Sequence, residues 1–198
     1  SNFPMIIIGD EVLENDFSLE TQDIVIKILD KFGGFTKNWN GFNILHNYAS
    51  TVGALDIIGK FSNYNHLSLE KDINKKLIKF VYLLNADDFN YDLSNCFVIY
   101  QGHHGDRGAQ MADVILPGSA YTEKDGSFIN LEGRLQYCQR AVFPPGEAKE
   151  DWAIIRALSE KLSKKIDFDN LKDLRDLMFK KVDRLDAFNE NSYELKPK

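Results

Sequence analysis

The sequence predicts an α/β fold with a mostly parallel sheet and flanking helices, and three observations lead to that prediction. The strand candidates are short and almost continuously apolar, which is typical of strands buried on both faces. Segments with apolar residues at helical spacing separate several of these runs. Glycine, proline or short polar clusters close them, as expected where a strand passes into a loop.

The first 76 residues are expected to contain one strand and two helices. Residues 5–9 form an apolar run closed by glycine, which predicts a buried strand. Residues 18–32 show helical spacing, with Ser18 as the N-cap and two glycines as the stop signal. A second helix is predicted over residues 43–58, because the apolar residues there fall near one face. Residues 62–76 are polar and indicate a connection with at most a short helical turn.

The rest of the chain is expected to complete the sheet and to end in helices. Three further strands are predicted from apolar runs at residues 80–84, 97–100 and 113–116. Residues 119–143 mix polar and aromatic residues, which indicates an irregular segment with short hairpin-like strands over the strand ends. Helical spacing then returns at residues 147–163 and 169–182, and the charged tail that follows is expected to fray.

Length and composition fit one domain of ordinary size, with residues 1–168 as the α/β domain and residues 169–198 as a C-terminal helix and tail. A formal net charge of -6 argues against nucleic acid as a partner, because phosphate recognition needs an excess of Lys and Arg. No apolar run approaches the roughly 20 residues needed to span a bilayer, so direct membrane insertion is not expected.

Metal binding has few candidate ligands in this sequence. Cys96 and Cys138 are the two cysteines, and they lie too far apart for the clustered thiolates of an iron–sulfur or structural zinc site. His103 and His104 with Asp106 offer imidazole and carboxylate groups, but adjacent histidines on an extended chain face opposite sides. The favoured interpretation is a loop after a strand, whose polar groups cap the following turn.

Phosphate binding and nucleophilic catalysis are equally weakly supported. Gly102, Gly105 and Gly108 follow a predicted strand, but their spacing differs from the dinucleotide fingerprint and Asp106 would repel phosphate. Turn glycines are therefore the favoured interpretation. Cys138 or a serine would need a positioned base, and no local motif supplies one. We expect no catalytic residues in the chain.

The densest polar constellation lies between residues 121 and 134. Its charged and amide side chains can recognise a large polar cofactor, or they can bind one another and tie an irregular loop to the sheet. The second interpretation is favoured. The residues concerned are Glu123, Lys124, Asn130, Glu132 and Arg134, with Gly126 and Gly133 between them.

The same stretch carries a resemblance to a known family. Residues 112–136 read ADVILPGSAYTEKDGSFINLEGRLQ, which resembles the "ADVVLP…EK…GT…N…EGR" signature of the molybdopterin oxidoreductase superfamily. Within it, the chain resembles the C-terminal region of the 75 kDa iron–sulfur subunits of respiratory complex I. The sequence segments that carry this resemblance are YQGHHGDRGAQMADVILP (100–117), PPGEAKEDWAIIRALSE (144–160), PMIIIG (4–9) and NILHNYASTVGALDIIG (43–59).

The resemblance implies a Rossmann-like domain that has lost the pterin cofactor and keeps the fold as a scaffold. It also implies that the family's iron–sulfur clusters belong to an N-terminal part of the subunit, and this chain contains none of their cysteine motifs. Glu123, Lys124, Gly126, Asn130, Glu132, Gly133 and Arg134 would then be a vestigial pterin-site motif. The implied partners are that cluster-bearing part and other peripheral-arm subunits, on the matrix side of the mitochondrial inner membrane.

A split subunit is the favoured explanation for a domain-sized chain without cluster ligands. The chain begins Ser-Asn-Phe-Pro, so a targeting segment is expected to be removed or to lie upstream. Such a piece should leave apolar sheet and helix surface uncovered and be unstable alone. One alternative is the C-terminal fragment of a working molybdenum enzyme, such as a formate dehydrogenase-like oxidoreductase. Another is a stand-alone α/β nucleotide-binding module.

The individual residue predictions are structural. Gly126 and Gly133 should occupy backbone positions that a side chain would strain. Arg134 is expected to form an ion pair with Glu132 or Glu123 that holds the loop. Trp152 and Ile155 are expected to seat the penultimate helix on the sheet.

Overall fold

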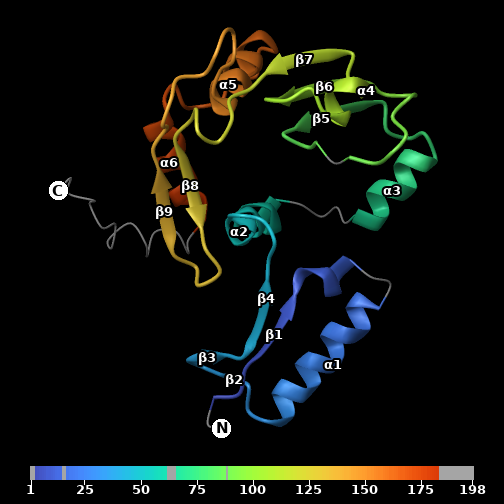
Figure 1. The fold of residues 1–198 in the computed structure, drawn as a ribbon, viewed down its shortest axis with the longest axis vertical. Helices are drawn as coiled ribbons and strands as arrows, with labels where there is room; N and C mark the ends of the chain where they lie inside the picture. The colour runs from blue at the N-terminus through green and yellow to red at the C-terminus, as the bar shows by residue number, and fades with distance from the viewer. Residues whose placement is uncertain (1–2, 15–16, 62–65, 88, 183–198) are drawn as a thin grey trace, which may run out of the picture. The chain divides into compact units, whose positions relative to one another are not determined.

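The computed structural model describes residues 3–14, 17–61, 66–87 and 89–182 (Figure 1). Its contacts divide the chain into two compact units. The first unit runs to Ala54 and also includes Ile129–Arg134, and the second contains the rest of the described chain. The predicted α/β class with parallel strands is confirmed in both units, whereas the predicted division at residue 168 stays a prediction.

A two-stranded parallel sheet and a helix form the first unit. The strands β1 (Ile6–Gly9) and β4 (Phe42–Leu45) pair in register from Ile6 opposite Phe42 to Gly9 opposite Leu45. Between them the chain forms η1 (Asp10–Glu14), α1 (Ser18–Lys31) and an antiparallel pair of two-residue strands, β2 (Phe35–Thr36) and β3 (Trp39–Asn40). The helix packs against β4 and buries Val25 and Leu29.

The bounds of α1 confirm the predicted helix but not its cap. Phe17 is the N-cap and no side chain caps the helix, so the prediction for Ser18 was wrong. The stop signal was right, because Gly33 has a φ of 74°, a conformation that favours glycine, and Gly34 donates its backbone N–H to Leu29 O.

The predicted helix over residues 43–58 was wrong at its N-terminal end. Residues 42–45 are β4, and the helix there, α2 (Thr51–Phe61), begins only after Ser50, whose φ is 63°. Pairing with β1 outweighs the helical spacing, a long-range effect that a local pattern does not contain. The polar connection contains a nine-residue helix, α3 (His66–Asn74), rather than a short turn, and its residues 62–65 lie outside the described residues.

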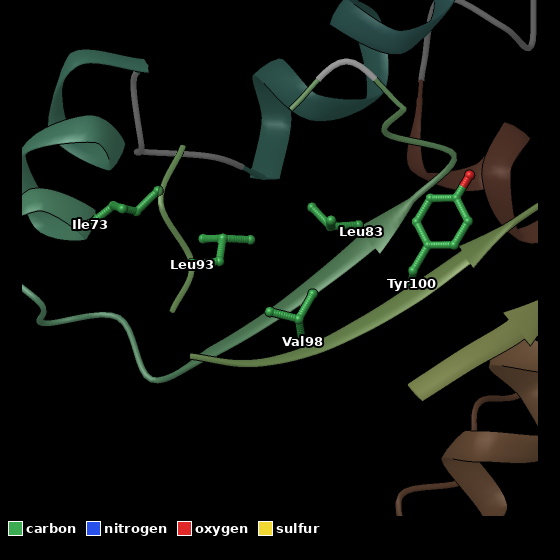
Figure 2. Close-up of a cluster of buried hydrophobic side chains, with 5 residues drawn as sticks. All are labelled: Ile73, Leu83, Leu93, Val98 and Tyr100. Atoms are coloured by element: carbon green, nitrogen blue, oxygen red, sulfur yellow. The ribbon is translucent and has the colours of Figure 1, made fainter. Parts of the chain in front are cut away.

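Three parallel strands form the sheet of the second unit and confirm three predicted strands. Their order is β5 (Phe80–Leu84), β6 (Phe97–Gly102) and β7 (Val114–Pro117), with the short helix α4 (Arg107–Met111) between the last two. Figure 2 shows the core on this sheet, where side chains from β5 and β6 meet others from α3 and the loop before β6. Its members are Ile73, Leu83, Leu93, Val98 and Tyr100.

The C-terminal part contains the predicted short strands and two helices. The strands β8 (Gly126–Ile129) and β9 (Leu135–Cys138) run in opposite directions (Figure 1), and α5 (Asp151–Lys161) and α6 (Leu171–Lys181) follow. The first of these helices begins four residues later than predicted. Lys149 instead extends beside β7, where it donates its backbone N–H to Pro117 O and pairs with Gly118. The predicted tail from residue 183 lies outside the described residues.

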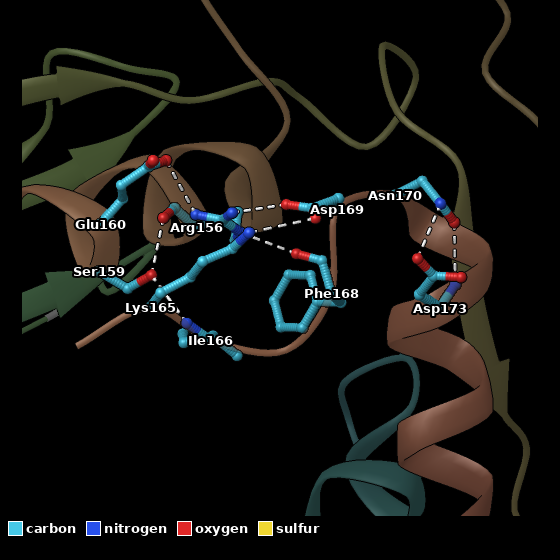
Figure 3. A network of polar contacts seen from close by, with 9 residues as sticks. All are labelled: Arg156, Ser159, Glu160, Lys165, Ile166, Phe168, Asp169, Asn170 and Asp173. Carbon is cyan, nitrogen blue, oxygen red and sulfur yellow. Dashed lines mark hydrogen bonds and ion pairs between the residues drawn. The ribbon is translucent and has the colours of Figure 1, made fainter. Parts of the chain in front are cut away.

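A buried arginine joins α5 to the chain before α6 (Figure 3). Arg156 donates through Nε to Phe168 O at 2.8 Å and through Nη2 to Asp169 Oδ1 at 2.5 Å. The hydrogen bond from Arg156 lowers the pKa of Asp169. Trp152 lies against the Phe168 ring, with ring centroids 6.3 Å apart, so this connection is where Trp152 packs. Seating of the helix on the sheet by Trp152 and Ile155 stays a prediction.

Among the residues described, no helix is both long enough and apolar enough to cross a membrane.

Candidate functional site

The candidate site is a polar network at the carboxyl ends of β5 and β6, the end of a parallel sheet where α/β proteins usually bind ligands. Its centre is Gln101, which is fully buried. The Gln101 side chain accepts a hydrogen bond from Tyr82 Oη at 2.5 Å and donates to Asp151 Oδ1 at 2.8 Å. Burial and then the charge of Asp151 raise the pKa of Tyr82, so its hydroxyl remains a donor at neutral pH.

Asp151 connects four parts of the second unit. As the first residue of α5, it places a carboxylate at a helix N-terminus, where the helix dipole stabilises negative charge. The carboxylate accepts from Gln101, from Asn85 Nδ2 at 3.3 Å and from Lys124 Nζ. The Lys124 and Asp151 side chains are only 24% and 19% exposed, so water screens their ion pair weakly. The pair ties the loop after β7 to the strand ends.

The other motif residues also bind groups within this chain. Glu123 accepts a hydrogen bond from Ala120 N at 3.0 Å. Asn130 Oδ1 accepts from Glu132 N at 3.0 Å and from Arg134 N at 2.8 Å, which closes a tight turn. Asn130 also accepts, through its backbone carbonyl, from Gly133 N at 2.9 Å.

The two glycines of the motif are constrained for different reasons. Gly133 has a φ of 80°, so the predicted backbone strain for a side chain there is confirmed. At Gly126 the limit is space, because an added Cβ would lie 2.6 Å from the Phe128 ring, which would have to move.

The motif divides between the two units. Glu123, Lys124 and Gly126 belong to the second unit, whereas Asn130 and residues 132–134 belong to the first. The predicted ion pair of Arg134 with Glu132 or Glu123 stays a prediction. The structure brings Lys124 together with Asp151, a partner that sequence reasoning missed. Asp151 lies in the first part of the helix predicted over residues 147–163 and is the first residue of α5, so an acidic residue near a helix start was the available signal.

The loop after β6 is built around a helix cap. Asp106 is the N-cap of α4, where it accepts from Ala109 N at 3.1 Å and from the Tyr100 hydroxyl. The predicted capping role of this loop is therefore confirmed. His103 and His104 stack edge to face, with ring centroids 4.5 Å apart, and help to line a hollow of about 530 Å³. Among the described residues, no group of three or more His, Cys, Asp or Glu is placed to hold a metal ion.

The pKa values of Tyr100 and Asp106 are shifted in opposite directions. Burial, followed by the hydrogen bond to Asp106, raises the pKa of Tyr100 far above its usual range. Partial burial works to raise the pKa of Asp106, but the hydrogen bonds from Tyr100, Ala109 N and Gly108 N outweigh it, so the Asp106 pKa is lowered. The tyrosine therefore stays protonated and the aspartate ionised across the neutral range.

Gly108 and Cys96 pack closely against neighbouring residues of this unit. An added Cβ on Gly108 would lie 2.7 Å from the Tyr100 ring and 2.8 Å from Ala86 O, so this glycine permits close packing. Cys96 packs beside the core and donates its thiol to Ile78 O at 3.3 Å. Cys138 is exposed on β9.

A pterin cofactor would need donors and acceptors that this chain leaves available. The structure shows the opposite arrangement for Lys124, Glu123 and Asn130, whose polar groups bind Asp151, Ala120 and the turn at residues 132–134. A pterin would have to displace these partners to bind the same atoms.

Two findings place the chain in a class and then in a family. Parallel strands with helices between them define an α/β domain. The family model for molybdopterin oxidoreductase matches residues 1–161, so the chain belongs to the molybdopterin oxidoreductase family.

Similar proteins narrow the resemblance further. The chain is 51% identical over 178 residues to the NADH-ubiquinone oxidoreductase 75 kDa subunit of Reclinomonas americana, covering 88% of this chain and 25% of that protein. It is 48% identical over 175 residues to the mitochondrial 78 kDa subunit of Candida albicans, covering 87% and 23%. It is 46% identical over 176 residues to an NADH-quinone oxidoreductase subunit of Rickettsia typhi, covering 88% and 25%. The resemblance predicted from the motif is confirmed, and the chain spans about a quarter of the length of these curated relatives.

Proposed function

We propose that the chain is a cluster-free structural part of the peripheral arm of an NADH:ubiquinone oxidoreductase. It would serve as the C-terminal part of the largest iron–sulfur subunit and support electron transfer through clusters held elsewhere. The similarity to 75 and 78 kDa subunits over almost nine-tenths of the chain supports this assignment.

The observation that carries the scaffold role is the ion pair between Lys124 and Asp151. In a cofactor-binding protein, a lysine at the carboxyl end of a parallel sheet is well placed to bind a charged ligand. Here its ammonium group is partly buried and bound to a carboxylate of the same chain. Asp151 also binds the fully buried Gln101. The motif therefore acts as an internal clamp, and in this proposal the chain carries no cofactor.

The cysteine content supports placing the clusters in another part of the complex. A cluster commonly takes four thiolate ligands. This chain has two cysteines, one packed beside the core of the second unit and one exposed on β9. The cluster-bearing N-terminal part of the subunit is accordingly the proposed main partner, with other peripheral-arm subunits beside it.

The proposed location is the matrix side of the mitochondrial inner membrane. Matches to a mitochondrial subunit of Candida albicans and to the subunit of Reclinomonas americana support it, while the Rickettsia relatives show that the family also occurs in bacteria. We also propose that the subunit is split into separate chains. Intact-mass measurement on the native complex tests this point, and one continuous polypeptide of full-subunit length would contradict it.

A native gel of solubilised membranes, stained for NADH dehydrogenase activity, tests the assignment. We expect this chain in the active band, in fixed proportion to the cluster-bearing polypeptides, when the band is analysed by quantitative mass spectrometry. An unrelated matrix protein of similar mass serves as the control for carry-over. Migration of the chain in another band, with molybdenum present there, would refute the proposal.

A further inference from the structure

The described residues of the first unit cover its parallel sheet only in part. The strands β1 and β4 pair side by side, with α1 next to them (Figure 1). Parallel strands occur almost entirely in sheets covered on both faces, and a sheet of two strands is marginal by itself. Residues that these strands leave exposed therefore indicate where a further element belongs.

Exposure differs between the two faces of this sheet. In β1 it alternates along the strand, with Ile6 and Ile8 half-buried and Ile7 60% exposed. Paired residues of parallel strands point to the same side, so Leu45, opposite Gly9, shares the face of Ile7 and is 54% exposed. Met5 alternates with Ile7 and is 44% exposed. Asn43, which is paired with Ile7, is half-buried on the same side. We call Met5, Ile7, Asn43 and Leu45 the open face.

The helix α1 also has apolar residues that are buried on one side and exposed on another. Val25 and Leu29 are buried, whereas Ile24 and Ile28, one helical turn apart, are 57% and 42% exposed. These two isoleucines form an apolar flank, which helices of α/β domains normally pack against a neighbouring element. The described residues of the first unit therefore leave this face of the sheet and this flank of α1 largely exposed.

We infer that the open face docks an apolar helix supplied by the cluster-bearing remainder of the subunit, an inference that rests on the proposed function. About three-quarters of the length of the matched relatives lies outside the part this chain spans. The rest of such a subunit is therefore long enough to supply a helix for this face. Apart from Asn43, the side chains of this face are apolar and fit a helix with an apolar stripe. Two parts of one domain held in this way form an obligate interface, usually about 2,000 Å² or more.

The three methionines of the chain provide a direct test in the native complex. Cells are grown with photo-methionine, the purified active complex is irradiated, and cross-linked peptides are mapped. Met5 belongs to the open face, whereas Met111 packs against the core cluster and Met178 lies in α6. We expect Met5 to cross-link to peptides of the cluster-bearing remainder, and Met111 to cross-link within its own unit.

Each other result at Met5 overturns the inference. A cross-link to residues 55–128 or 135–198 of this chain would mean that its own second unit covers the face. A cross-link to a second copy, or to a different subunit, would give the face another occupant. Absence of Met5 cross-links while Met111 reacts would mean that no protein lies there.

A pair of substitutions gives a second measurement. Ile7→Thr keeps a β-branched side chain that suits a strand but weakens an apolar interface, and Leu162→Thr changes an exposed leucine, 65% exposed, of the second unit. We expect Ile7→Thr to lower the proportion of the chain in the active band about tenfold, and Leu162→Thr to leave it unchanged. Hydrogen exchange of the β4 amides, expected to be unaltered, reports whether the strand pair persists.

The two proposals fail in different ways. If the unsubstituted chain migrates away from the active band, the proposed function is wrong. If the chain migrates with that band and Ile7→Thr assembles normally, the proposed function stands and the docking inference is wrong.

Discussion

The two parallel sheets differ in how much of their cover this chain supplies. In the second unit, Leu83 and Val98 are 3% and 1% exposed, because α3 and a loop complete a core over the strands. In the first unit, Ile7 and Leu45 remain more than half exposed. Both sheets contain an apolar run, residues 6–8 in the first unit and residues 97–100 in the second. Apolar strands therefore predict where a sheet forms but not whether one chain can bury it, and the first unit is where we expect dependence on a partner.

The largest effect should follow removal of a core side chain from the second unit. Leu83→Ala deletes a side chain that is 3% exposed, and such cavities cost about 2–5 kcal/mol. In the assembled complex, exchange of the β6 amides should accelerate by about 30-fold to about 5,000-fold. Ile7→Ala, at an exposed site, should leave the β6 amides unchanged. Equal acceleration by both changes would remove the distinction between the sheets.

The Asp151 clamp should have the next largest effect. Asp151→Ala removes the acceptor for Lys124, Gln101 and Asn85, and leaving a buried donor such as Gln101 Nε2 without this partner costs about 1–3 kcal/mol. We expect faster exchange and easier proteolysis of residues 118–125. The control is Glu147→Ala, an exposed acid four residues earlier. Unchanged protection after Asp151→Ala would show that the network does not hold the loop.

A smaller, local effect is expected at the Arg156 contacts. Arg156→Ala leaves the carbonyl of Phe168, itself a buried residue, without this donor, so the connection between α5 and α6 should open about tenfold more often. Arg156→Lys should rescue only part of the loss, because lysine lacks the guanidinium fork. Lys172→Ala removes an exposed pair with Asp176 and should change little. Hydrogen exchange of residues 162–170 distinguishes these outcomes.

The smallest effect should be on how the stability of the fold changes with pH, through Asp106 in the second unit. The pKa of Asp106 is lowered in the folded chain, so its ionised form stabilises the fold above about pH 4. That contribution should disappear as the pH falls through the folded pKa. Thermal melting of the complex between pH 3 and pH 6 should therefore decline less steeply for Asp106→Asn. Identical pH profiles would contradict the role assigned to this carboxylate.

The raised pKa of Tyr100 leads to an independent prediction at high pH. A free tyrosine ionises near pH 10, but Tyr100 is buried beside an ionised carboxylate and should remain protonated there. Comparison of the tyrosinate absorbance of the unsubstituted chain with that of Tyr100→Phe should show no difference at pH 10.5 while the fold persists. A difference of one tyrosinate would contradict the pairing with Asp106.

Local patterns predicted the sheet of the second unit well, because residues 80–84 and 97–100 are apolar throughout and have no competing structure. The same patterns failed at residues 42–45, since Ile44 and Leu45 also fit a helical spacing and only their pairing with distant β1 decides for a strand. The start of α5 was missed for a similar reason, as Lys149 binds Pro117 on β7.

The candidate site was predicted in part. The motif identified Lys124 and also Gly133, where a side chain would be strained. Comparison of a capping role with metal binding identified the role of Asp106. Sequence reasoning missed Asp151 and Gln101, because their meeting depends on how α5 approaches the strand ends. Side chains 50 residues apart in the chain leave no spacing signal of their own.

The content of molybdenum and pterin in the purified active complex tests the central claim most directly. The measurement needs the chain quantified in the same sample, together with iron as an internal standard for intact clusters. We predict iron in the amount that the clusters require, and neither molybdenum nor pterin in stoichiometric proportion to this chain. One molybdenum and its pterin for each copy of the chain would contradict the account, and would make the motif around Lys124 part of a working cofactor site.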